Sequence, residues 1–301
     1  MKNRKFHVVL IVATLVVVGI AVSAASRTGR SQAQLSNHTQ RSKTERTVKM
    51  TDRPRPSETS NSSAEFTSAA SQNASLRNDV TWTFGGKQQS GWSLYDLLIG
   101  KTLNTEHDPV TSDFAASLSK WQKKSGLGST GVLDQNSLMA MISQWQRNCL
   151  KVRTAATPDQ LVLAPASDFY DPSRAAEMRQ VEKKTYEAYK EMVAAAHADP
   201  TLKLSANDKH LKIISAFRSR EYQDELRRKS PNAGSAGLAV NSPHFTGRAL
   251  DLYVGGSPVD TKDSNRAIQV NTPAYRWLVR NAERFGFRPY FYEPWHWEYV
   301  K

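Results

Sequence analysis

The chain has 301 residues, 39% hydrophobic and 23% charged, which is ordinary for a soluble globular protein of one or two domains. Its single cysteine, Cys149, excludes an intrachain disulfide, and no catalytic motif surrounds it, so we expect a structural residue. The formal net charge is +13, and residues 1–60 hold 11 Lys and Arg against 3 Asp and Glu, a contribution of +8. The basic excess therefore lies mostly in the N-terminal tail.

The first segment, residues 1–25, has the features of an export signal. Three basic residues open it, and the run from 8 to 25 is almost entirely apolar and ends in small residues. This run is long for a cleaved signal peptide and barely long enough for a membrane-spanning helix, so both a signal peptide and an N-terminal membrane anchor stay open. In either case we expect the rest of the chain in the periplasm or elsewhere in the cell envelope.

Residues 26–80 are rich in Ser, Thr, Gln, Asn and Arg and almost lack aromatic side chains. Such a segment buries too little apolar surface to offset the chain entropy lost on folding, so we expect a disordered basic linker. Its charge favours contact with an anionic cell wall or membrane surface. Because the tail has no interleaved aromatic residues, we expect no nucleic acid partner.

A compact helical domain is predicted over residues 81–148. Phe114, Leu118 and Trp121 recur at helical spacing after a Ser-Asp cap signal, and a glycine-rich turn leads into a second helix at 135–145. Trp-Gln at this first helix, Gly-Leu after it and Gly-Val-Leu-Asp before the second helix resemble the small three-helix peptidoglycan-binding domain. The resemblance implies an all-α domain that binds peptidoglycan. A plain helical hairpin with core tryptophans is the alternative.

An α+β domain is predicted over residues 171–301, after a connector at 149–170 that contains two prolines. Periodicity and cap signals predict helices at 171–197, 220–229 and 272–286, and strands at 203–204, 211–216, 248–254 and 295–300. Strands and helices mixed in this order, with hairpin-length spacings late in the chain, are typical of the α+β class.

Two motifs of this domain carry candidate chemistry. His244 and Asp251 flank Gly247, and His296 follows Glu293 by three positions in an aromatic, strand-like run. Two His and one Asp make a three-ligand zinc set with a fourth position open. Glu293 is then spare, and a carboxylate beside a metal site is suited to take a proton from water. Each residue alone is more often a turn, cap or core residue, but their joint occurrence favours a metallohydrolase.

Three sequence elements together resemble a known enzyme group. Ser-x-His-x-x-Gly-x-Ala-x-Asp at 242–251, followed by Glu-Pro-Trp-His at 293–296, is similar to the signature of the LAS metallopeptidases, which share a fold with hedgehog domains. A Ser-x-x-Arg-Ser element at 215–219, with a Tyr-Gln after it, makes the VanY-type D-alanyl-D-alanine carboxypeptidases the resemblance within that group. This implies Zn²⁺ bound by the two His and the Asp, with the Glu as catalytic base.

The same resemblance implies roles for residues around the metal. Arg218 is expected to stabilise the substrate carbonyl oxygen or to grip the substrate's terminal carboxylate. Gln223 and Ser242 are expected to help bind that carboxylate. Pro243 and Phe245 depart from the residues that the family often has beside its ligand His, and we expect them to affect how the substrate is held.

The sequence therefore predicts a zinc carboxypeptidase that removes the terminal D-alanine from peptidoglycan stem peptides during cell-wall remodelling. A cross-link endopeptidase of the same zinc family and a non-catalytic wall-binding protein are the alternatives. The sequence leaves open whether the bond cut is of the D,D or the L,D type.

Overall fold

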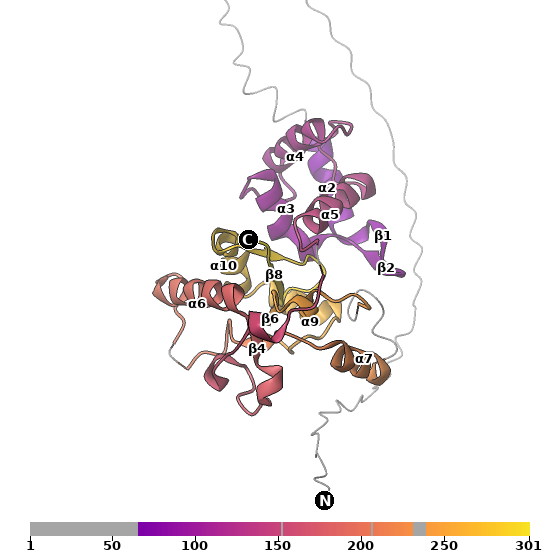
Figure 1. Cartoon of the computed structure of the whole chain (residues 1–301). Helices are drawn as coiled ribbons and strands as arrows, with labels where there is room; N and C mark the ends of the chain where they lie inside the picture. The colour runs from indigo at the N-terminus through magenta and orange to yellow at the C-terminus, as the bar shows by residue number, and fades with distance from the viewer. Residues whose placement is uncertain (1–65, 152, 206, 231–238) are drawn as a thin grey trace, which may run out of the picture. The chain divides into compact units, whose positions relative to one another are not determined.

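The computed structural model describes residues 66–151, 153–205, 207–230 and 239–301, which belong to one compact unit (Figure 1). The predicted export segment and most of the predicted linker lie outside the described residues. Within the described part of the chain, no helix is both long enough and apolar enough to cross a membrane.

The first part of the described chain, residues 66–148, is built from helices and one hairpin, and we call it the N-terminal module. Its elements are α2 (Thr67–Asp79), β1 (Thr81–Phe84), β2 (Lys87–Ser90), the 3₁₀ helix η1 (Ser93–Tyr95), α3 (Asp96–Leu103), α4 (Ser112–Lys124) and α5 (Gln135–Arg147). Both predicted helices are confirmed as α4 and α5. Thr111 caps α4 and Asp134 caps α5, each by accepting a hydrogen bond from a backbone N–H in the first turn.

Helix α2 shows that the predicted linker, which reached residue 80, was drawn too long. Ala69, Ala70 and Asn73 of this helix are buried. The Asn73 amide donates to the carbonyl of Gly131 at 2.9 Å and accepts from the N–H of Leu133 at 2.7 Å. A helix buried through alanines and one asparagine has no large apolar stripe, so composition did not reveal it.

The β1–β2 hairpin corrects the expectation of an all-α domain in this region. The two strands pair antiparallel from Thr81 opposite Ser90 to Phe84 opposite Lys87. The Trp82 side chain is buried, and its indole N–H donates to the carbonyl of Gly91 at 2.9 Å. Peptidoglycan binding by the module stays a prediction.

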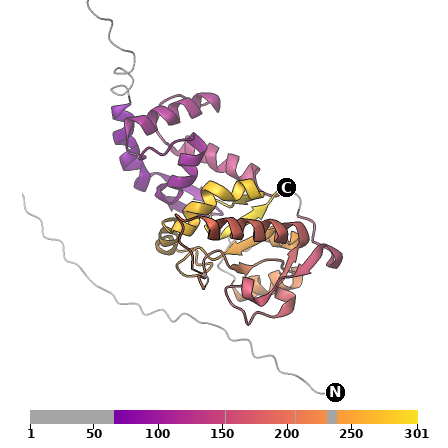
Figure 2. The same cartoon turned by 90° about the vertical axis from the view of Figure 1, so that its left-hand side faces the viewer.

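The C-terminal part is α+β, as predicted, and is built on an antiparallel sheet in the order β5-β6-β8-β7. Its strands are β5 (Ile213–Ser215), β6 (Ala249–Leu252), β7 (Phe287–Pro289) and β8 (His296–Tyr299). A second sheet pairs β3 (Leu161–Leu163) with β4 (Gln180–Glu182). The helices are α6 (Lys183–Ala198), α7 (Arg220–Lys229), α9 (Asp263–Val270) and α10 (Pro273–Asn281), with 3₁₀ helices η2 (Pro158–Gln160), η3 (Ala166–Asp168), η4 (Ala176–Met178), η6 (Pro243–Thr246) and η7 (Ala282–Phe285). Figure 2 shows α6 lying across the strands of the larger sheet.

The predicted helix at 171–197 is wrong in its first part. Asp171 accepts hydrogen bonds from the backbone N–H and the hydroxyl of Ser173, which makes a local turn instead of a helix cap. The helix begins only after Glu182, whose carboxylate accepts from the N–H of Thr185 at 2.8 Å. Between these two points the chain forms η4 and the strand β4.

Two further elements differ from their predictions. The predicted strand at 203–204 is absent from the described chain, where Lys203 has a φ of 50°, a left-handed conformation outside the β region. The predicted helix at 272–286 divides into α10 and η7, and it ends at Gly286 with a φ of 91°. The helix at 220–229 is confirmed as α7.

Strand β6 is the centre of the C-terminal domain. All of its residues are buried, with Leu250 and Leu252 on one face and Asp251 on the other. The register sets Asp251 opposite His296 on β8 and opposite Ser215 on β5. A carboxylate is therefore fixed in the middle of a buried sheet, with an imidazole beside it.

Candidate active site

Three residues with metal-ligating side chains meet at this point of the sheet. His244 lies on η6, Asp251 on β6 and His296 at the start of β8, and all three are buried. Gly247 turns the chain between η6 and β6 at a φ of 65°, where a side chain would meet the backbone nitrogen of Glu182. Ser242 caps η6 at its N-terminus, and its hydroxyl accepts from the N–H of His244 at 3.3 Å.

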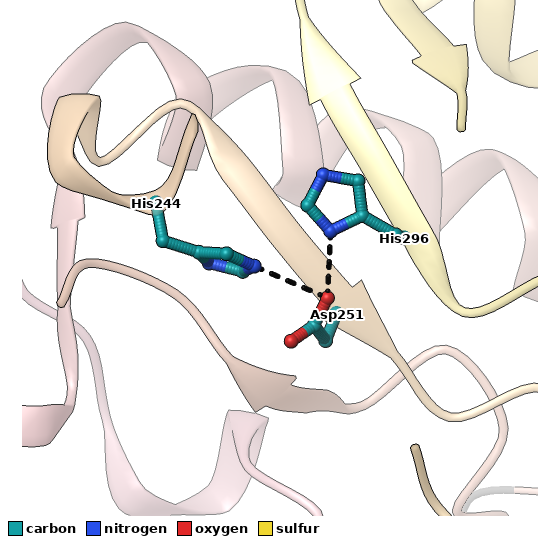
Figure 3. A group of neighbouring side chains, drawn as sticks. All are labelled: His244, Asp251 and His296. Atoms are coloured by element: carbon teal, nitrogen blue, oxygen red, sulfur yellow. Dashed lines mark hydrogen bonds and ion pairs between the residues drawn. The ribbon is translucent and has the colours of Figure 1, made fainter. Parts of the chain in front are cut away.

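Figure 3 shows both imidazoles directed at the same carboxylate. His244 Nε2 lies 3.3 Å and His296 Nδ1 lies 2.9 Å from Asp251 Oδ1. One ligand atom from each of the three residues lies within 4.8 Å of the others. Two imidazole nitrogens and a carboxylate oxygen at such separations are the ligand set of a divalent metal such as zinc.

The ring nitrogen of each imidazole that does not face Asp251 has a polar partner of its own. His244 Nδ1 lies 2.7 Å from the carbonyl oxygen of Ala216, which can only accept, so this nitrogen carries the proton and Nε2 is free to bind a metal. His296 Nε2 lies 3.4 Å from Glu298 Oε1. Such outer partners fix the ring orientation of metal ligands, and the two histidines present different nitrogens to the same point.

The protonation states also suit a cation at this position. Burial lowers the pKa of His244 to about 4, and Arg218 adds to the effect, so the ring is neutral. Burial opposes a charge on His296, but its bonds to Asp251 and Glu298 raise its pKa to about 10. Burial would also raise the pKa of Asp251, yet His244 and Arg218 hold it well below its usual value. The carboxylate of Asp251 therefore favours positive charge at this position.

Glu293 lies on the loop between β7 and β8, residues 290–295, which we call the Glu293 loop. The N–H of His296 donates to the carbonyl of Glu293 at 2.9 Å, so the loop closes tightly before β8 begins. Glu293 is 8% exposed. Burial raises the pKa of its carboxyl to about 8, and His296 partly opposes this shift.

Arg218 lies on the other side of Asp251. Its Nη2 donates to Asp251 Oδ2 at 2.5 Å, and its Nε donates to the hydroxyl of Ser215 at 2.8 Å. Gln223, at the buried side of α7, accepts from Arg218 Nη1 at 3.5 Å and donates to the carbonyl of Ala239 at 3.1 Å. The guanidinium is therefore held on several sides, which fixes its position.

These side chains surround a cavity of about 470 Å³. Six of the seven predicted site residues line it: Arg218, Ser242, His244, Asp251, Glu293 and His296. Gln223 is not among the lining residues. It lies against Arg218 and helps to hold the guanidinium, while its expected contact with the substrate carboxylate stays a prediction.

Sequence reasoning assigned no role to two residues that hold the site. Ser215 orients Arg218, and Glu298 orients His296. Glu298 could have been found, because it follows His296 by two positions on a strand and so lies on the same face. Its burial beside a ligand was the missing information: Glu298 is 2% exposed.

A buried His-Asp-His set beside a buried carboxylate and a fixed guanidinium, on an α+β sheet, defines a metallopeptidase-type site. Residues 178–301 match the family described as VanY, D-alanyl-D-alanine carboxypeptidase. Residues 178–301 therefore form a VanY-type peptidase domain, and the candidate metal site lies within it.

Among solved structures, a carboxypeptidase is similar to part of this chain. The structure is that of the LdcB LD-carboxypeptidase, which is described as revealing the molecular basis of peptidoglycan recognition. The sequence identity is 25%, the match covers 48% of this chain and 70% of that chain, and the TM-score is 0.35. A search of curated proteins found no significant match.

Proposed function

We propose that this protein is a zinc-dependent carboxypeptidase that removes the terminal D-alanine from peptidoglycan stem peptides. One observation carries the proposal: the candidate ligands, a buried carboxylate and a fixed guanidinium line the same cavity. The family match supplies the class of substrate. The presence of Glu293 and of all three candidate ligands in this cavity disfavours the alternative of a non-catalytic wall-binding protein.

The donor set fits Zn²⁺, which His244, Asp251 and His296 would hold. When bound, the ion supplies a Lewis acid that polarises the scissile carbonyl and makes water a better nucleophile. Asp251 also carries Arg218 on its second oxygen. The metal position and the guanidinium are thereby fixed relative to each other through one carboxylate.

Glu293 acts as the general base in this proposal. It faces the same cavity as the candidate ligands, and its burial makes it a stronger base than an exposed carboxylate. It accepts a proton from the attacking water and then delivers it to the leaving amine. These two steps need one group that can reach both positions, and a loop carboxylate beside the metal ligands meets that need.

Arg218 recognises the substrate's charge. A carboxypeptidase must bind a free C-terminal carboxylate, and a guanidinium does so through charge-assisted hydrogen bonds. Ser242 lines the same cavity and adds a hydroxyl, while Gln223 holds Arg218 in place. Where the carboxylate binds elsewhere in the cavity, Arg218 instead stabilises the developing negative charge on the carbonyl oxygen.

Hydrolysis of defined peptides tests the proposal. We expect the zinc-loaded chain to release D-alanine from a stem pentapeptide that ends in D-alanyl-D-alanine, as seen by mass spectrometry. Amidation of that C-terminus removes the charge that Arg218 grips, and the loss of about 1.5–3 kcal/mol slows cleavage roughly tenfold to a hundredfold. Arg218→Ala should reduce the difference in cleavage rate between the free and the amidated peptide.

The other outcomes of this assay are equally informative. Equal cleavage of the free and amidated peptides identifies an endopeptidase and leaves Arg218 with the oxyanion role. Cleavage of the tetrapeptide and not of the pentapeptide identifies an L,D specificity. No cleavage of any stem peptide refutes the proposed function.

We further propose that the protein is exported and that its basic tail rests on an anionic wall or membrane surface. The apolar run near the N-terminus and the charge of residues 1–60 support this. Fractionation of cells that express the full chain tests it. Recovery in the cytoplasmic fraction alone contradicts export, and retention that does not respond to salt contradicts an electrostatic role for the tail.

A further inference from the structure

We propose that the N-terminal module is part of the active site: its aromatic side chains hold the Glu293 loop in the position from which Glu293 acts. The inference rests on the function proposed above, since it gives the module a positioning task in that reaction. The resemblance of this region to a separate wall-binding domain predicts no such task.

Aromatic side chains of the module enclose Phe291, the second residue of the Glu293 loop. The ring of Phe291 is 2% exposed. Its centroid lies 4.8 Å from Phe84, 5.6 Å from Tyr95, 6.1 Å from Trp145 and 6.4 Å from Trp82. These four module residues, which we call the aromatic clamp, come from β1, η1 and α5. They anchor the loop two positions before Glu293.

The next loop residue is anchored through a buried cation. Tyr292 lies 5.1 Å from the ring of Phe84. Arg266 of α9 stacks over the Tyr292 ring at 4.4 Å and donates to the hydroxyl of Tyr95 at 2.5 Å. Arg266 is 1% exposed, so this contact is made away from water, where such interactions are strongest. The position directly before Glu293 is thus tied to the module as well.

The loop needs this support. A catalytic group must be held within about 0.5 Å of its productive position, and loops hold side chains less well than strands do. The backbone of Glu293 bonds within the turn, to Tyr290 at 3.3 Å and to His296 at 2.9 Å. The two side chains directly before Glu293, those of Phe291 and Tyr292, therefore help to decide where the carboxylate lies, and the module holds both.

The chain that leaves the module makes a second connection. The N–H of Leu150 donates to Glu298 Oε2 at 2.6 Å, and the other oxygen of this carboxylate faces His296. Gln146 of α5 and Arg153 line the active-site cavity itself. The module and the segment after it therefore support both sides of the site: the loop that carries Glu293 and the carboxylate of Glu298 beside His296.

Phe84→Ala tests the inference in the full chain. Phe84 is only partly buried, at the end of β1, and touches the loop rather than the middle of the module. Trp121→Ala is the matched control, because Trp121 is an aromatic residue of the same exposure class on α4, which packs against α2 and α3. Phe84→Leu restores apolar volume. Each variant is measured for kcat and KM on the stem peptide, for zinc content, and for hydrogen exchange of residues 290–296 without metal.

We expect Phe84→Ala to lower kcat about tenfold to a hundredfold, since small displacements of a catalytic group have effects of that size. KM and zinc content should stay close to those of the unaltered chain, and exchange in the Glu293 loop should become at least about tenfold faster as the loop opens more often. Phe84→Leu should recover part of both effects, and Trp121→Ala should show neither. Unchanged kcat and unchanged loop exchange in Phe84→Ala overturn the inference.

The two proposals fail in different ways. If the unaltered chain cuts no stem peptide, the proposed function is refuted, and hydrogen exchange alone decides whether the module holds the loop. If the unaltered chain is active and Phe84→Ala is equally active, only the positioning role is refuted. Should Phe84→Ala lose its fold by circular dichroism, Tyr95→Phe replaces it, because it removes only the hydroxyl that accepts from Arg266.

Discussion

At the scale of single residues, the site separates two buried carboxylates by what surrounds them. Asp251 faces His244, His296 and Arg218, and its pKa is held well below the usual value although burial alone would raise it. Glu293 has no ion pair shorter than 4.0 Å among the described residues, and burial raises its pKa to about 8. One carboxylate is thus suited to bind a cation and the other to exchange a proton.

Glu293→Gln tests this division of roles. The amide keeps the shape of the side chain but cannot accept the proton from water, so we expect a loss of turnover of about a hundredfold or more with zinc still bound. Rates on the stem pentapeptide and zinc per chain are measured together. Glu225→Gln, an exposed carboxylate on α7, is the control. Near-normal turnover of the Glu293 variant removes this residue from the role of base.

Glu298→Gln tests the support of the metal ligand. Glu298 accepts from Leu150 and lies beside His296 Nε2, so its charge fixes the ring and favours metal binding at Nδ1. Loss of such an outer partner weakens metal affinity about tenfold to a hundredfold. Competition with a chelator measures the affinity, and Glu283→Gln, a half-exposed carboxylate of η7, serves as control. An unaltered zinc affinity would show that Glu298 is only a packing residue.

At the scale of elements, the sequence predicted what is local and missed what is tertiary. The motifs at 242–251 and 293–296 predicted the candidate ligands, because the first sets one ligand on a turn and one on a strand, and the second sets one at the start of a strand. The pairing of Asp251 with His296 needed only two neighbouring strands. By contrast, Asp171 looked like the cap of a helix, but its side chain accepts a hydrogen bond from Ser173, two residues ahead, and so forms a turn. The position of Gln223 behind Arg218 follows from the packing of α7, which no spacing specifies.

Helix α2 is another element that the sequence did not predict, and its contribution to stability can be measured. Asn73 is fully buried and bonds both the carbonyl of Gly131 and the N–H of Leu133. Asn73→Ala leaves these two buried backbone groups without partners, at a cost of about 1–3 kcal/mol each. Thermal and urea unfolding should therefore show a large loss of stability. Ser71→Ala, at an exposed position of the same helix, should show almost none. Equal stability of the two variants would mean that α2 is not part of the folded module.

At the scale of the molecule, the module and the C-terminal domain share one apolar core. Trp82, Tyr95 and Trp145 of the module belong to the same buried cluster as Leu250 and Trp297 of the larger sheet. Lys101 of α3 adds a polar link, because its ammonium group donates to the carbonyl of Val279 on α10 at 2.7 Å. Separating the two parts exposes aromatic surface on both, so we expect them to unfold together.

Zinc removal tests this coupling. The candidate ligands come from η6, β6 and β8, so the ion binds the folded chain and not the unfolded one. Zinc at about a thousandfold excess over its Kd then adds roughly 4 kcal/mol of stability. For a unit of this size that raises Tm by on the order of 10 °C relative to the chain in a chelator. His296→Ala should abolish the zinc-dependent shift. Tryptophan fluorescence, which reports on both parts, should show one transition that moves with zinc. A module that melts in a separate transition, at the same temperature with and without zinc, would show that the shared core does not couple the two parts.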